Sequence, residues 1–122
     1  MRKIKFRGLA YAGVDGKKIK PQMVYGSLRI NEEMDYASIS TFKNKQGATY
    51  TYLVDPESIA QFIGYDADGN EIYEGDKVHG INGTMVGHTF TARLANVAQS
   101  TNGMYWGFQS EDVRKESGEN EN

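Results

Sequence analysis

The sequence predicts a mainly β protein that is built from short strands joined by tight turns. Its 14 glycines and only 2 prolines in 122 residues indicate many turns and no proline-rich linker. Eight tyrosines and five phenylalanines favour strands, and an aromatic share of 11% argues against disorder. Turn signals recur about every 8–12 residues, a spacing that is typical of a small barrel or sandwich.

The first strand is predicted from an alternation of charged and apolar residues over 3–9. Lys3, Lys5 and Arg7 fall on one face, and Ile4 and Phe6 fall on the other. A half-buried strand therefore opens the chain.

The strands that follow are marked by turn residues. Asp15-Gly16 predicts a hairpin turn, after which the chain returns as a strand over 23–28. The other features of this half are a polar break at 31–33, a strand at 36–42, a hairpin tip at 43–47 and a strand at 49–54.

One short helix is predicted after these strands. Asp55 is a helix-capping residue and Pro56 suits the first helical position. Only about six residues separate this start from Gly64, so we expect no more than one or two turns.

The last part of the chain again favours strands. A strand is predicted to begin at residues 72–73, to bend at 74–76 and to continue at 77–78. A further strand is predicted over 89–95, where alternation places Phe90, Ala92 and Leu94 on one side. Asn82-Gly83 and Asn102-Gly103 predict hairpin turns, the second leading into an aromatic strand over 104–108.

Length and composition predict a single domain over 1–115, with an N-terminal portion 1–54 and a second portion 55–115. The acidic residues 116–122 are predicted to be disordered. The chain has no cysteine, no signal peptide and no apolar run of about 20 residues, so we expect a cytoplasmic protein with no membrane association. A net charge of −2 gives no global sign of a nucleic-acid partner.

An acidic cluster is the first candidate for chemistry. It comprises Asp66, Asp68, Glu71, Glu74 and Asp76. If Gly69 takes the central glycine position of a calcium loop, the first and last ligand positions fall on glycines, so this template fails. We predict turns here, with no metal, no cofactor and no catalytic residue; a metal-dependent hydrolase that uses these acids is the alternative.

The remaining residues give little support for an enzyme. His79 and His88 have no clear third ligand, and we expect them to be exposed or to pack in loops. No serine lies in a nucleophile elbow, and no phosphate-binding loop is present.

The basic N-terminal segment is the second candidate. Its proposed nucleic-acid contacts are Lys3, Lys5, Arg7, Lys17 and Lys18, with Tyr11 and Tyr25 as nearby aromatics. The alternative is a charged edge strand that discourages aggregation.

Near the other end of the chain, Tyr105 and Trp106 are candidate interface residues. Alternation places them on opposite faces, with Trp106 and Phe108 together.

Three segments of the chain resemble the YopX family of small proteins from phages and prophages. They are the opening Arg2–Arg7, the motif Met23-Val24-Tyr25, and the block from Val54 to Val78. Ala60 and Ile63 depart from the family pattern, and residues after His79 match it little. The signature residues within the block are Gly64, Gly69, Glu71, Ile72, Tyr73, Glu74, Gly75, Asp76 and Val78.

The resemblance implies an SH3-like barrel in the C-terminal half, with the N-terminal β portion as an extension, and a phage or prophage protein that works inside a bacterial cell. It carries no catalytic residues that could be transferred to this chain. We therefore expect a non-catalytic interaction module that forms a homo-oligomer and binds a host or phage macromolecule, such as a protein. Nucleic-acid binding through the basic strand is the alternative, and the hydrolase is a further one.

Overall fold

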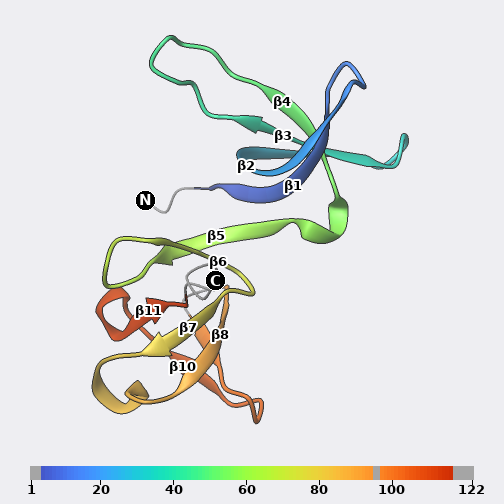
Figure 1. Ribbon diagram of the computed structural model, residues 1–122. Coiled ribbons are helices and arrows are strands. Elements are labelled where there is room, and N and C mark those ends of the chain that lie inside the picture. Colours follow the sequence, from blue (N-terminus) through green and yellow to red (C-terminus); the bar gives the residue numbers. More distant parts are fainter. Residues whose placement is uncertain (1–3, 95–96, 117–122) are drawn as a thin grey trace. The chain divides into compact units, whose positions relative to one another are not determined.

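The chain folds into short antiparallel strands, as the computed structural model shows for residues 4–94 and 97–116 (Figure 1). This described part contains no α-helix, and its helical turns are single turns of 3-10 helix. The prediction of a mainly β protein is confirmed. The strands are β1 (Phe6–Gly13), β2 (Lys18–Asn31), β3 (Tyr36–Thr41), β4 (Thr51–Val54), β5 (Ala60–Tyr65), β6 (Glu71–Tyr73), β7 (Lys77–Gly80), β8 (Thr89–Arg93), β9 (Val97–Gln99), β10 (Tyr105–Gly107) and β11 (Val113–Lys115).

The packing divides the chain into two units, Met1–Gln61 and Phe62–Asn122. In the first unit β1 pairs with β2, β2 with β3 and β3 with β4, and β4 pairs in turn with β1. These four strands thus form a closed circuit of antiparallel pairings. Their inward side chains are small or β-branched and form a core of Ala10, Val24, Ala37, Ile39 and Val54.

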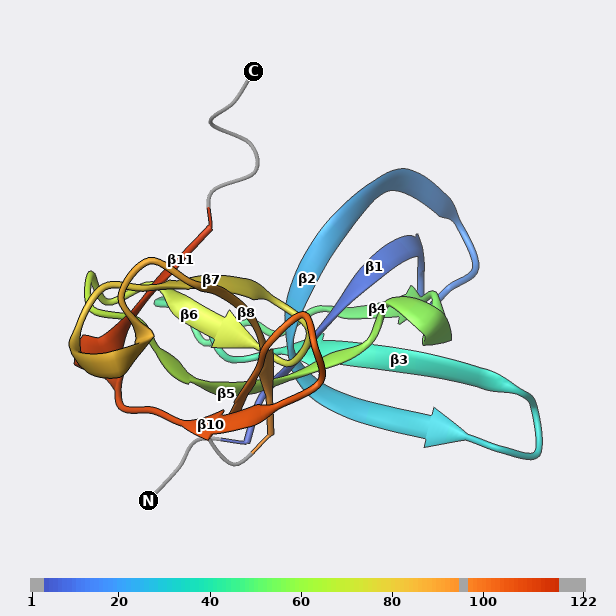
Figure 2. The ribbon, with the colours of Figure 1, turned by 90° about the horizontal axis from the view of Figure 1, so that it is seen from below.

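The long strand β2 carries two successive pairings (Figure 2). Its first part pairs with β1 and its last part with β3, and Gly26 pairs with Phe6 of one and Thr41 of the other. A Cβ atom on Gly26 would overlap the backbone carbonyl of Ser40. A glycine is therefore required where β2 passes from one partner strand to the next.

The predicted helix after Val54 is a single 3-10 turn, η1 (Pro56–Ser58). The Asp55 side chain accepts a 3.0 Å hydrogen bond from the Glu57 N–H, so the predicted cap is confirmed. The turn cannot lengthen because β5 begins at Ala60 and its first residues pair with β1.

The second unit is built on a five-stranded sheet in the order β10-β9-β8-β7-β11, and β5 pairs with β6. Its core combines side chains from most of these strands: Ile63, Ile72, Val78, Met85, Phe90, Ala92, Ala98, Phe108 and Val113. Trp106 packs against this core from β10. Two further 3-10 turns, η2 (Gly83–Met85) and η3 (Ser110–Asp112), lie between the strands.

Several local predictions are confirmed by this structure. Asp15-Gly16 forms the turn between β1 and β2, with Gly16 at a φ of 87°. Asn102-Gly103 turns the chain before β10, and Gly103 has a φ of 91°. Both glycines adopt the left-handed conformation that these turns require.

Other local predictions are only partly confirmed or are wrong. Asn82-Gly83 lies in the connection of the β7–β8 hairpin, as predicted, but it does not form a two-residue turn. The Asn82 side chain caps η2, and the connection between β7 and β8 is longer than two residues because it places Met85 in the core. Ile4 precedes β1 and is 71% exposed, and Leu94 lies beyond the end of β8 and is 40% exposed.

Three strands, β5, β9 and β11, were not predicted, and β5 occupies residues that were expected to continue the short helix. The tail predicted to be disordered lies outside the described residues except for Glu116, whose N–H donates a 2.9 Å hydrogen bond to the Lys77 carbonyl.

Candidate functional site

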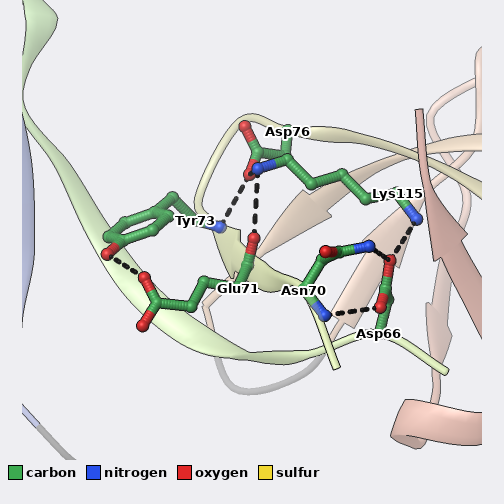
Figure 3. Close-up of polar contacts among 6 residues, drawn as sticks. All are labelled: Asp66, Asn70, Glu71, Tyr73, Asp76 and Lys115. Carbon is green, nitrogen blue, oxygen red and sulfur yellow. Dashed lines mark hydrogen bonds and ion pairs between the residues drawn. The ribbon is translucent and has the colours of Figure 1, made fainter. Parts of the chain in front are cut away.

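Asp66 is the centre of the acidic segment. It lies just after β5 and is only 3% exposed. One carboxylate oxygen accepts 2.9 Å hydrogen bonds from the N–H groups of Asp68 and Asn70, which closes the turn. The other oxygen accepts from the Asn70 side chain at 3.3 Å and from the Lys115 N–H at 2.8 Å (Figure 3). A single side chain therefore joins this turn to β11.

The ionisation of Asp66 follows from these contacts. Burial acts against the charged form, but hydrogen bonds from the N–H groups of Lys115, Asn70 and Asp68 and from the Asn70 side chain outweigh it. Together they hold the pKa of Asp66 below its ordinary value of 3.8. The group is thus an anion near neutral pH, and its lone pairs are directed at backbone donors.

Asp76 and Glu71 have similar structural roles. Oδ2 of Asp76 accepts a 2.8 Å hydrogen bond from the Tyr73 N–H, and the Tyr73 hydroxyl donates to Glu71 Oε1 at 2.8 Å (Figure 3). Lys115 Nζ lies 3.6 Å from Asp76 Oδ2 and donates to the Glu71 carbonyl oxygen at 3.1 Å. These contacts also bind the acidic segment to β11.

Asp68 makes the most exposed of these contacts. Its Oδ2 accepts a 2.7 Å charged hydrogen bond from Arg114 Nε, and both side chains are about half exposed. Within residues 4–94 and 97–116, no group of three or more acidic or histidine side chains is placed to hold a metal ion. The arrangement of the acids is that of a structural clasp, which we call the β11 clasp: Asp66, Asp68, Glu71, Asp76 and their partners Arg114 and Lys115.

The other signature residues shape the same region. Gly69 and Gly75 have φ values of 86° and 93° in the turns that flank β6. Gly64 lies at an irregularity in the β5–β6 pairing, while Ile72 and Val78 are fully buried. Glu74 lies in the turn after β6.

The predicted basic stripe lies on the first unit, and Lys3 falls outside the described residues. Arg7 is on β1 opposite Tyr25 of β2, and Lys5 Nζ lies 5.9 Å from the centre of the Tyr25 ring. Lys17 and Lys18 are exposed at the other end of the β1–β2 hairpin. The structure thus brings Lys5 and Arg7 together and separates Lys17 and Lys18 from them along the strands.

Exposed apolar side chains occupy the same surface. They are Leu9 and Tyr11 on β1 and Met23 and Tyr25 on β2, each about 40% exposed. Leu9 pairs with Met23 across the strands. Sequence reasoning noted the two tyrosines but missed Leu9 and Met23, although alternation with the buried Gly8, Ala10 and Val24 would have placed them. We call this surface, with Lys5 and Arg7, the β1–β2 outer face.

The two candidate interface residues on β10 differ in exposure. Tyr105 is 66% exposed, whereas Trp106 is half-buried and packs against the core beside Phe90. Alternation along the strand predicted these opposite faces correctly.

The two histidines are exposed and do not converge on a site. His79 Nδ1 lies 3.2 Å from the Thr89 hydroxyl and its Nε2 lies 3.9 Å from Glu116. The His88 ring packs near Phe90. These positions agree with the prediction of exposed or loop-packing histidines.

Comparisons with known proteins identify no relative. No family model, no curated protein and no solved structure matches the chain. Among the described residues, no helix is both long and apolar enough to cross a membrane.

Proposed function

We propose that this chain is a non-catalytic interaction module of a phage or prophage that works in the bacterial cytoplasm. The resemblance to the YopX family supports this origin. We further propose that the portion 55–115 contains an SH3-like barrel, which is supported by a five-stranded antiparallel sheet of short strands around one core.

The observation that carries the binding role is the β1–β2 outer face. Four apolar or aromatic side chains lie exposed on two adjacent strands, beside a lysine and an arginine. Contiguous apolar surface on a soluble protein is most often a binding site, and tyrosine, methionine and arginine are enriched in such sites. The carboxylates of Asp66, Asp68 and Asp76 are instead engaged with Lys115 and Arg114 in the β11 clasp, which favours binding over catalysis as the role of the protein.

Self-association is proposed through β10. This strand is at one end of the five-stranded sheet, so one side of its backbone has no partner strand in that sheet. Met104 and Tyr105 are 56% and 66% exposed beside this edge. At the other end of the sheet, the backbone of β11 is already bonded to the turn after β5, because the Ala67 N–H donates to the Val113 carbonyl and the Lys115 N–H donates to Asp66. This makes β10 the better edge for pairing with a second copy.

Light scattering after size-exclusion chromatography tests this proposal over about a hundredfold range of protein concentration. We expect the wild-type chain to form a dimer, and the double variant Met104→Ser/Tyr105→Ser to shift towards monomer. Tyr50→Ser is the matched control because Tyr50 is also exposed, at 54%, but lies in the first unit. A wild-type chain that stays monomeric throughout contradicts self-association.

A further inference from the structure

The β1–β2 outer face combines aromatic and apolar side chains with two cations. Its rings and apolar chains offer flat surface, with Tyr11 and Tyr25 at 44% and 41% exposure. Its cations adjoin them directly, because Arg7 is the cross-strand partner of Tyr25 and Lys5 lies over the Tyr25 ring. Flat aromatic surface beside positive charge is the combination that single-stranded nucleic acids bind.

Further cations lie along β2 towards the β1–β2 turn. They are Lys18, the cross-strand partner of Ala12, and Lys20. Both lysines are exposed, as is Lys17 in the preceding turn. A polyanion that contacts the aromatic side chains therefore also meets positive charge further along the hairpin.

The charge of the chain is divided unequally between its two units. Residues 1–61 contain ten lysines and arginines against six aspartates and glutamates, a formal charge of +4. Residues 62–122 contain four against ten, a formal charge of −6. The small net charge of −2 conceals this difference. Electrostatics thus favour a polyanionic ligand on the first unit and disfavour one on the second.

We propose that the β1–β2 outer face binds single-stranded nucleic acid, by stacking bases on Tyr11 and Tyr25 while the cations contact phosphates. This inference rests on the proposed function, of which it names the ligand. Unpaired bases expose the flat faces that tyrosine rings stack on, whereas a duplex keeps its bases stacked within the helix. A protein partner would also fit an apolar surface, but it would not require the positive charge of the first unit.

Fluorescence anisotropy with labelled oligo-dT and oligo-rU of about 20 nucleotides tests the proposal, since one such module spans about 4–16 nucleotides. A mixed-sequence duplex of the same length and heparin are the comparison ligands. We expect the single strands to bind more tightly than the duplex at low salt. We also expect the logarithm of the affinity to fall with the logarithm of salt concentration, by about 0.7 for each phosphate contacted.

Substitutions separate stacking from charge. Tyr11→Leu and Tyr25→Leu keep apolar bulk but remove the rings, and each should weaken binding about five- to a hundredfold with little change in salt dependence. Lys18→Ala/Lys20→Ala should instead flatten the salt dependence. Matched controls lie on the loop between β3 and β4: Tyr50→Leu removes an exposed ring, and Lys43→Ala/Lys45→Ala removes two exposed charges. These controls should bind as wild type does, and thermal melting confirms that each variant is folded.

Two results overturn the inference. The first is that neither single strand binds at low salt. The second is that the duplex and heparin bind as tightly as the single strands, and that Tyr11→Leu and Tyr25→Leu leave all of these affinities unchanged. Light scattering on the same samples distinguishes this failure from failure of the proposed function. A dimer that binds no oligonucleotide overturns the nucleic-acid inference but leaves self-association through β10 in place. A monomer that binds none contradicts both proposals.

Discussion

The N–H of Lys115 donates a 2.8 Å hydrogen bond to the carboxylate of Asp66, which lies 49 residues earlier in the sequence. The same carboxylate closes the turn through the N–H groups of Asp68 and Asn70. One buried side chain therefore organises a local turn and fixes β11.

Replacing Asp66 should destabilise the second unit strongly. Asp66→Asn keeps the shape of the side chain but directs an amide N–H₂ group towards N–H donors, and we expect a loss of about 2–3 kcal/mol in the free energy of unfolding. Asp68→Asn is the control, because its ion pair with Arg114 is about half exposed and such pairs contribute about 0–1 kcal/mol. Urea denaturation measures both, and equal losses would show that burial of Asp66 has no energetic weight.

The same side chain should make the stability of the protein depend on pH in the acid range. The pKa of Asp66 is lower in the folded chain than its ordinary value of 3.8, so the unfolded state binds the proton more tightly. The stabilisation is therefore complete above about pH 5 and is lost as the pH falls through 3.8 towards the folded pKa. Denaturation at a series of pH values gives the free energy of unfolding as a function of pH. Below pH 3.8 this free energy should fall less steeply for Asp66→Asn than for wild type. If the free energy of unfolding depends on pH in the same way in both proteins, Asp66 is not the source of the acid dependence.

Adjacent residues of β11 should differ in their contribution to stability. Lys115→Met removes the contacts with Asp76 and with the Glu71 carbonyl but keeps the apolar stem, at an expected cost of about 1 kcal/mol. Arg114→Met, which removes only an exposed ion pair, should change the free energy of unfolding by less than about 0.5 kcal/mol. Thermal denaturation ranks the two variants, and the reverse order would mean that the β11 clasp depends mainly on its exposed pair.

A methyl group at Gly26 should disrupt the first unit. Gly26→Ala places a Cβ atom against the backbone carbonyl of Ser40, which cannot rotate away, so we expect a loss of about 3 kcal/mol or more. Gly107→Ala is the matched control in a strand, since a Cβ atom there meets nothing within 4 Å among residues 4–94 and 97–116. Circular dichroism and urea denaturation of the two proteins make the comparison. A Gly26→Ala protein as stable as Gly107→Ala would show that β2 can shift away from β3.

Local features of the structure could be predicted where the chain supplies its own signal. Asp15-Gly16 requires a left-handed glycine and forms the expected turn, and Asp55 caps η1 through a bond two residues away. At Asn82-Gly83 the same reasoning predicted the hairpin but not the length of its connection, which contains η2 and places Met85 in the core. Propensity thus decides a turn only where packing does not act against it.

Features that depend on distant partners could not be predicted. The strands β9 and β11 have three residues each, too few for a periodic pattern, and β11 is held by side chains about 45 residues away. The acidic segment was correctly interpreted as turns, but the burial of Asp66 follows from Lys115 and has no signature in residues 66–76. The β1–β2 outer face was only partly anticipated, since pairing of Leu9 with Met23 requires the register.

The long sequence separation between Asp66 and Lys115 has a kinetic consequence. The bonds from Asp66 to Asp68 and Asn70 can form as soon as the turn does, whereas the bond to Lys115 requires the closure of a long loop. Contacts that form after the transition state slow unfolding and leave the folding rate unchanged. The β11 clasp should therefore act mainly on the lifetime of the folded chain, and its loss should be seen as faster unfolding at the C-terminal end.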